Sequence, residues 1–178
     1  GMRVPRIASA LALAIAASAC VPSAEPPPVN PSPAPTPVPV ATPTPTLTGD
    51  WRDWPLTNGD WTYRQDASGS TALYGQAGAA PDFTIRCDKR ANRVYLSLQG
   101  AAPGALPVTI RTSSQTRTLS AQPTGGTPQT MTVALAANDR LLDAMGFSRG
   151  RFIVQMPPMA TLVIPSYAEV LRVTEDCR

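Results

Sequence analysis

The sequence predicts a mainly β protein: an antiparallel β-sandwich or barrel-like domain with a short helix, a C-terminal helix and one disulfide bond. The first observation is that short segments of alternating apolar and polar residues recur between residues 61 and 164. The second is that turn-forming residues separate these segments at short intervals, whereas parallel strands need helical crossovers between them. Antiparallel pairing is therefore expected.

The composition divides the chain into three parts. Eleven of the 21 prolines lie between Pro22 and Pro45, and all ten aromatic residues lie from Trp51 onward. The 129 residues from 50 to 178 are enough to bury a core of their own. We expect a leader at 1–19, a tether at 20–49 and a single β-rich globular domain at 50–178.

Most of the predicted strands form hairpins. Residues 83–87 and 94–98 alternate apolar with polar on either side of the polar turn 88–92. The other expected pairs are 61–65 with 71–74, 108–112 with 116–119, and 151–156 with 161–164 around Pro157–Pro158. A further strand at 131–135 follows a loop predicted at Pro123–Pro128.

Two short helices are expected among the strands. Asn138 or Asp139 can cap the first helix, which ends at Gly146. The second follows Pro165, where residues 166–169 have the pattern of a capping box. Its buried face is expected to carry Tyr167, Val170, Leu171 and Thr174.

The first 19 residues have the pattern of a signal peptide. Arg3 and Arg6 supply a basic start, and residues 7–19 are almost entirely apolar. These 13 residues are too few for a helix that crosses a bilayer, which needs about 20. We interpret Gly1, ahead of Met2, as a cloning remnant and expect the mature protein to be exported.

The leader ends in Ala17-Ser18-Ala19-Cys20, which resembles the lipobox of bacterial lipoproteins. The resemblance implies that the leader is cleaved before Cys20, that Cys20 is acylated, and that the lipid bilayer is a partner. The lipobox usually has a large aliphatic residue at the position of Ala17, and ordinary signal peptidase could also cleave after Ala19. In such lipoproteins an Asp after the cysteine favours the inner membrane. Val21 at that position implies the outer membrane, facing the periplasm.

Two further cysteines remain, Cys87 and Cys177. Exported proteins fold in an oxidising compartment, so the even number of cysteines left after Cys20 predicts one disulfide bond between these two. The bond would tie the terminal helix to the strand at 83–87. Two buried free thiols are the alternative, whereas two distant cysteines in a chain without histidine do not predict a zinc site.

Residues 21–49 consist largely of Pro, Ala, Thr, Val and Ser. Repeated Pro-x pairs favour polyproline II, and the segment has one charged residue and no aromatic residue to bury. We expect a semi-rigid spacer that carries the domain away from the lipid surface. A ligand for a proline-recognising partner is the alternative.

The composition also excludes several function classes. Histidine is absent, which removes the commonest general base and the commonest metal ligand. Without Arg3 and Arg6 the mature chain has 13 basic and 12 acidic residues, a net charge of +1, and no basic run longer than Lys89-Arg90. Nucleic-acid binding therefore has no electrostatic support, and neither a metal nor another cofactor is expected.

Two sets of residues are candidates for binding. Trp51, Trp54 and Trp61 lie within eleven residues and could form an aromatic platform for a glycan or a peptide; a lid that closes the open end of the sheet is the alternative. Arg149 and Arg151 lie in one predicted loop, and arginine forks suit carboxylate or phosphate recognition. A solvated turn is the alternative for this pair.

The order of motifs in residues 59–178 resembles that of small proteobacterial periplasmic lipoproteins. These motifs include Ile-Arg-Cys at 85–87, Leu-Leu-Asp-Ala at 141–144 and Glu-Asp-Cys-Arg at 175–178. A looser likeness is to the VasI-like periplasmic domains associated with type VI secretion, which also have an Arg-Cys strand and a cysteine in the last helix. Neither resemblance implies an activity or a catalytic residue.

Three functional hypotheses follow. The preferred one is a membrane-anchored, non-enzymatic binding or scaffolding module for a protein or cell-wall partner. A lysozyme- or hydrolase-inhibitor lipoprotein is an alternative, in which the loop 148–151 would enter the cleft of an enzyme. An enzyme with carboxylate chemistry is the third, and it would need two acidic side chains brought together in a deep pocket.

Overall fold

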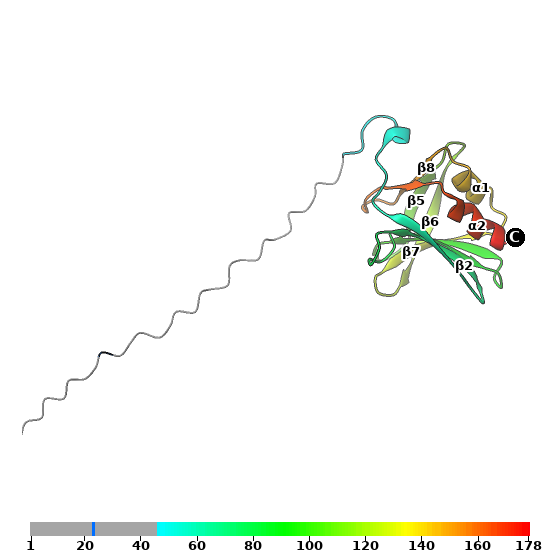
Figure 1. Ribbon diagram of the computed structural model, residues 1–178, viewed down its shortest axis with the longest axis horizontal. Helices are drawn as coiled ribbons and strands as arrows, with labels where there is room; N and C mark the ends of the chain where they lie inside the picture. The colour runs from blue at the N-terminus through cyan, green and yellow to red at the C-terminus, as the bar shows by residue number, and fades with distance from the viewer. Residues whose placement is uncertain (1–22, 24–45) are drawn as a thin grey trace, which may run out of the picture. The chain divides into compact units, whose positions relative to one another are not determined.

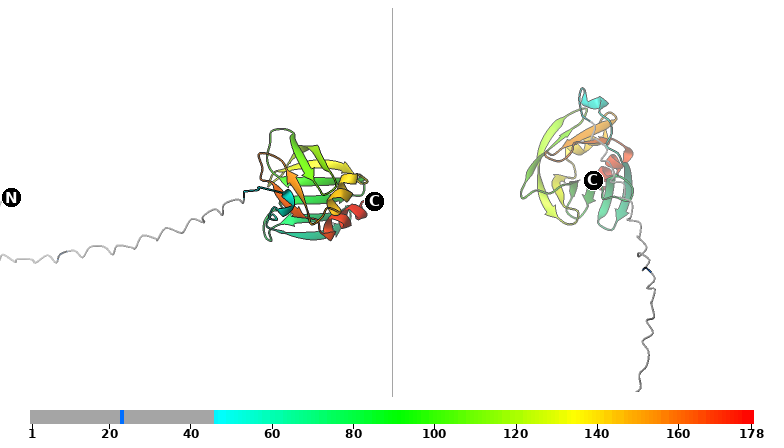
Figure 2. Two further views of the ribbon diagram at one scale, coloured as in Figure 1. Left: turned by 90° about the horizontal axis from the view of Figure 1, so that it is seen from above. Right: turned by 90° about the vertical axis from the view of Figure 1, so that its left-hand side faces the viewer.

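The computed structural model describes Ser23 and residues 46–178, and residues 46–178 lie in one compact unit (Figures 1 and 2). Strands make up 44% of the described residues and helices 14%, which confirms the predicted mainly β class. The predicted leader, Cys20 and most of the predicted tether lie outside the described residues.

Nine antiparallel strands form one curled sheet, in the order β1-β2-β3-β4-β7-β6-β5-β8-β9. The strands are β1 (Asp60–Asp66), β2 (Gly69–Gly75), β3 (Phe83–Asp88), β4 (Arg93–Gln99), β5 (Leu106–Arg111), β6 (Thr116–Gly125), β7 (Thr130–Ala136), β8 (Arg151–Gln155) and β9 (Leu162–Pro165). The four predicted hairpins are all present, as β1–β2, β3–β4, β5–β6 and β8–β9.

Strand β6 makes the corner that allows the sheet to curl. Its first part, Thr116–Ala121, pairs with β5, and its last part pairs with β7 across a register shift between Pro123 and Gly125. The predicted loop at Pro123–Pro128 is therefore too long, since β6 continues to Gly125. Proline is tolerated in a strand where a bulge interrupts the ladder of hydrogen bonds, and the register shift provides such a place.

The two edges of the curled sheet, β1 and β9, are connected by hydrogen bonds from β1 itself and from Thr57, in the segment just before β1. The Thr57 amide donates to the Val163 carbonyl oxygen over 2.9 Å, and the Val163 amide donates to Oγ1 of Thr57 over 2.9 Å. The indole N–H of Trp61 in β1 donates to the carbonyl oxygen of Pro165 in β9 over 2.9 Å. These contacts bring the sheet close to a barrel.

The inward-facing side chains form one hydrophobic core. Alternate residues of each strand contribute to it, as in β3, where Phe83, Ile85 and Cys87 are buried and the residues between them are not. Aromatic rings line the centre: the Trp61 and Tyr74 rings lie 5.3 Å apart, and the Phe83 and Phe152 rings lie 5.9 Å apart.

Helix α1 (Arg140–Gly146) forms as the sequence predicts. The Asp139 side chain caps it by accepting a hydrogen bond from the Leu141 amide over 2.9 Å. At the end of the helix a Cβ atom on Gly146 would lie 2.2 Å from Cδ2 of Leu171, so glycine allows α1 and α2 to lie against each other (Figure 1).

Helix α2 (Ala168–Asp176) forms, but the predicted capping box does not. Tyr167 occupies the N-cap position without a side-chain cap, and the buried Ser166 Oγ has no hydrogen-bond partner among the described residues. The buried face also differs from the predicted one, since Leu171 is only half-buried. That face carries Val170, Val173 and Thr174, whereas Tyr167 is exposed.

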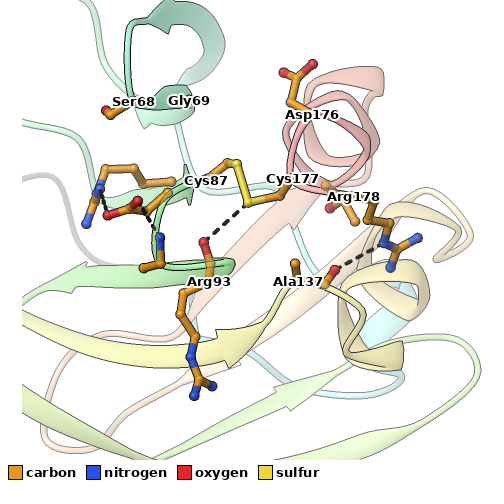
Figure 3. The surroundings of a disulfide bond; sticks show 12 residues. Ser68, Gly69, Cys87, Arg93, Ala137, Asp176, Cys177 and Arg178 are labelled. Carbon is orange, nitrogen blue, oxygen red and sulfur yellow. Dashed lines mark hydrogen bonds and ion pairs between the residues drawn. A yellow bond between two sulfur atoms is a disulfide. The ribbon is translucent and has the colours of Figure 1, made fainter.

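The predicted disulfide bond between Cys87 and Cys177 is present, with the two Cα atoms 5.5 Å apart (Figure 3). It ties the end of α2 to β3, as the sequence predicts. The chain approaches closely here, since a Cβ atom on Gly69 in β2 would lie 2.2 Å from the Cys87 carbonyl oxygen. The terminal Arg178 adds a hydrogen bond to the Ala137 carbonyl oxygen and an ion pair with Asp143.

Candidate functional site

The segment that precedes the first strand is held against the outside of the sheet, and we call residues 47–58 the strap. It contains the short 3-10 helix η1 (Trp51–Asp53), which lies next to β8 in Figures 1 and 2. Asp50 caps η1 by accepting a hydrogen bond from the Arg52 amide over 3.0 Å. The indole N–H of Trp54 donates to the Thr48 carbonyl oxygen over 3.2 Å, which closes the turn.

The strap is bonded to β8 and β9, two strands that carry buried apolar side chains on their outer face. Ile153 and Val163 alternate with core residues along their strands and therefore point away from the core. Both are nevertheless only 1% exposed. Thr57 pairs directly with Val163, and the Arg151 guanidinium donates to the Trp54 carbonyl oxygen, so the strap is fixed to both strands.

The three candidate tryptophans do not form one aromatic platform. Trp61 is 8% exposed and belongs to the core, so its ring is not available to a ligand at the surface. Trp51 and Trp54 are half-buried in the strap, where the Arg52 guanidinium lies 4.9 Å from the centre of the Trp51 ring. Of the two alternatives, the geometry of Trp61 corresponds to the lid, because its indole bonds to the opposite edge of the sheet.

The two candidate arginines also have different surroundings. Arg151 is half-buried and holds the strap through the Trp54 carbonyl oxygen. Arg149 is exposed, on a loop that is fixed to a neighbouring turn because its amide donates to Ser113 Oγ over 3.0 Å. Ser148 Oγ strengthens this connection by accepting from the Ser113 amide over 2.9 Å. The loop therefore exposes the Arg149 guanidinium, which takes part in no ion pair among the described residues.

A groove of about 500 Å³ lies alongside the strap. The strap forms one wall, and the other walls come from the chain after β2, from the residue before β3 and from the start of β9. Its lining residues are Leu47, Pro55, Leu56, Thr57, Asn58, Gln76, Asp82, Ala160, Thr161, Leu162 and Val163. Apolar side chains predominate among them, and Leu56 is 42% exposed although it is large and hydrophobic.

Asp82 is the single acidic residue that lines this groove, and no basic residue lines it. Burial raises the pKa of the Asp82 carboxyl above its ordinary value of 3.8. Among the described residues its carboxylate takes part in no ion pair, although its backbone is fixed by a hydrogen bond of 2.8 Å to the Tyr74 carbonyl oxygen. The groove thus combines apolar walls with one uncompensated acid.

Replacing Asp82 with asparagine is expected to stabilise the domain at neutral pH. A raised pKa means that the folded state holds the proton more tightly than the unfolded chain does, so the wild type loses stability as the pH rises from 3.8 through the folded-state pKa. The Asp82→Asn variant should therefore have the higher urea midpoint at pH 7. This difference should disappear as the pH falls well below 3.8, where the Asp82 carboxyl is protonated in both states of the wild type.

Asp176 provides a control of opposite sign. Burial raises its pKa, but the hydrogen bond from the Tyr63 hydroxyl and the positive charges of Lys89 and Arg172 outweigh burial and leave the pKa below its ordinary value. Its ionised form therefore favours folding above the unfolded-state pKa. Asp176→Asn should lower the urea midpoint at pH 7, and a lower midpoint for Asp82→Asn as well would contradict the assignment for Asp82.

Sequence reasoning did not identify the groove residues. Leu56 and Asp82 carry no motif, and they are far apart in the chain. Their proximity depends on the strap crossing β9, and the pairing of Thr57 with Val163 has no signal in the sequence. The described residues contain no group of three side chains that could hold a metal ion, and none of their helices has the length and apolar character needed to cross a bilayer.

Comparisons of the chain with protein-family models, with curated proteins and with solved structures found no match.

Proposed function

We propose that this chain is a lipoprotein anchored to the outer membrane through Cys20, and that its domain is a non-enzymatic binding module facing the periplasm. The groove beside the strap is the observation that carries the binding role, because it combines exposed apolar walls with an uncompensated carboxylate. The partner in this proposal is a protein or the cell wall.

Two further features support an exported protein. The Cys87–Cys177 disulfide bond is of a kind that persists in oxidising compartments and is rare in the cytosol. The apolar segment at residues 7–19 and the lipobox-like residues 17–20 supply a leader and a lipidation site. Two or three acyl chains would hold the protein stably on a membrane, since each buried methylene contributes about 0.8 kcal/mol.

The anchoring part of the proposal is tested by mass spectrometry of the protein purified from membranes of its native host. The mature chain should begin at Cys20, and its first peptide should carry the mass of the attached acyl chains. A Cys20→Ser variant should no longer fractionate with the membrane. An unmodified cysteine at position 20 in the mature protein would refute the anchor.

The binding part is tested by crosslinking in the native host. The lipidated wild-type protein is treated with a short photocrosslinker that does not depend on amino or carboxyl groups for its reaction. Crosslinking should give one or a few defined products, which mass spectrometry identifies. A diffuse pattern with no defined product would contradict a binding module. The inhibitor hypothesis has a separate test, in which the purified protein is added to a muramidase. If the wild type slows the muramidase and the Arg149→Ala variant does not, the inhibitor hypothesis would take the place of the present proposal.

A further inference from the structure

We infer that the groove beside the strap binds an extended peptide segment of a partner protein in which a basic side chain is flanked by apolar residues. This inference rests on the proposed function, because it names the class of partner that the binding module accepts. It depends on the walls of the groove, on its charge and on a strand edge at its rim.

The walls favour apolar side chains. Leu47, Pro55 and Leu56 line the strap side, and Leu162 and Val163 line the β9 side. The volume of about 500 Å³ lies within the range of sites that enclose a small ligand, so it can hold a few side chains rather than a folded domain. Covering these walls would remove the exposed part of Leu56 from water, which favours binding.

The charge favours a cation at one point in the groove. Asp82 is its only ionisable lining residue, and no ion pair within the described residues neutralises the Asp82 carboxylate. A partly buried carboxylate without a cation is destabilising, and a guanidinium or ammonium group brought by a ligand would compensate it. The acidic or neutral segments of a partner would leave this charge uncompensated, so they should bind less well.

The rim offers a strand edge to an extended backbone. The Val163 amide and carbonyl both face the strap, where they bond to Thr57. Thr161 directly precedes β9 and lines the groove, so its amide and carbonyl groups lie at the end of this edge. In the part of the chain that the structure describes, these Thr161 groups have no backbone partner. An extended peptide can pair with such an edge while its side chains enter the groove.

The proline-rich segment of the same chain matches this chemistry poorly. Residues 21–46, which precede the strap, contain one acidic residue, Glu25, and no lysine or arginine. Their many prolines also lack the amide groups that a strand edge requires. Charge complementarity therefore favours a basic segment of another protein as the occupant.

The inference is tested by fluorescence anisotropy with the mature protein and synthetic seven-residue peptides. The flanking positions are valine and leucine, and the central position is arginine, lysine, citrulline or glutamate. Citrulline has the shape of arginine without its charge. Arginine and lysine peptides should bind saturably, and citrulline and glutamate peptides should bind about tenfold more weakly or not at all. Equal binding of the arginine and citrulline peptides would overturn the inference.

Three variants locate the binding in the groove. Asp82→Asn should abolish the preference for arginine over citrulline, whereas Asp53→Asn, which removes an exposed acid of the strap that does not line the groove, should preserve it. Leu56→Ser should weaken the binding of the arginine and citrulline peptides by the same factor, because it removes an apolar side chain from the wall and leaves the charge of Asp82 in place. An unchanged preference in Asp82→Asn would show that the peptides bind elsewhere and would refute the inference.

A photoreactive residue distinguishes this inference from the proposed function. p-Benzoylphenylalanine replaces either Leu56 in the groove or Phe147, which is 72% exposed and does not line the groove, and the two proteins are irradiated in the native host. Products from position 56 alone support the inference. Products from position 147 alone would support a binding module but refute the groove as its site. No product from either position would refute the inference, whereas the proposed function would be contradicted only if the crosslinked wild-type protein also gave no defined product.

Discussion

Removing the Cys87–Cys177 disulfide bond is expected to lower the free energy of unfolding by about 4 to 5 kcal/mol. This value applies when the bond acts entirely by reducing the conformational entropy of the unfolded chain. The two cysteines are 90 residues apart, so the bond closes a loop that includes most of the folded domain. The unfolded chain without this closure gains conformational freedom, and the folded state gains none. The variant to measure is the double substitution Cys87→Ala with Cys177→Ala, in urea unfolding followed by circular dichroism.

Alanine is the appropriate replacement because both cysteines are buried and a serine would bring a polar hydroxyl group into the core. Reduction of the wild type under denaturing conditions supplies an independent measurement of the same bond. The two measurements should agree within about 1 kcal/mol, after allowance for the small cavity that alanine leaves. A double variant as stable as the oxidised wild type would contradict the role assigned to the bond.

Replacing Trp61 with alanine is expected to lower the free energy of unfolding by about 3 to 5 kcal/mol, the range for truncation of a large buried aromatic side chain. The ring packs against Tyr74 and Phe83 in the core, and its N–H bonds to Pro165 at the other edge of the sheet. The substitution therefore removes core packing and one of the contacts that join β1 to β9. Urea unfolding measures the total effect.

Trp61→Phe separates the two contributions. Phenylalanine retains most of the packing and loses the hydrogen bond to Pro165, so its effect should be smaller, at about 1 kcal/mol. The Pro165 carbonyl oxygen also accepts from the Tyr167 amide, which limits the penalty of losing the indole. Trp54→Phe is a matched control outside the core. A Trp61→Ala variant no less stable than this control would contradict the placement of Trp61 in the core.

Much of the fold could be predicted from the sequence, because the strands follow local rules. In β3 and β4 apolar residues alternate with polar residues, and a polar turn separates the two strands. The Cys87–Cys177 pairing followed from counting cysteines in a chain expected to be exported. Helix α2 shows where such rules fail: Ser166 and Glu169 match the capping pattern, but the backbone at Tyr167 stays extended and the helix begins later.

The candidate site could not be predicted in the same way, because it depends on contacts between distant segments. The tryptophans at positions 51, 54 and 61 are clustered in the sequence and were therefore candidates for one binding surface. Trp61, however, lies in β1 at a position whose side chain points into the core. Asp82 is an ordinary polar residue next to a proline in the sequence. Asp82 becomes the acidic residue of the groove only in the folded domain, where Leu56 of the strap and Leu162 of β9 line the same groove.

The strap would have a mechanical consequence for the domain under the proposed anchor at Cys20. Any tension on the chain ahead of residue 46 enters the domain through the strap before it reaches β1. The first bonds loaded are those of Trp54 and Thr57, which connect the strap to β8 and β9, while the core behind them is spared. Since Leu47 and Leu56 also form one wall of the groove, pulling the strap away from the sheet would open that wall, so the proposed peptide binding would weaken under tension.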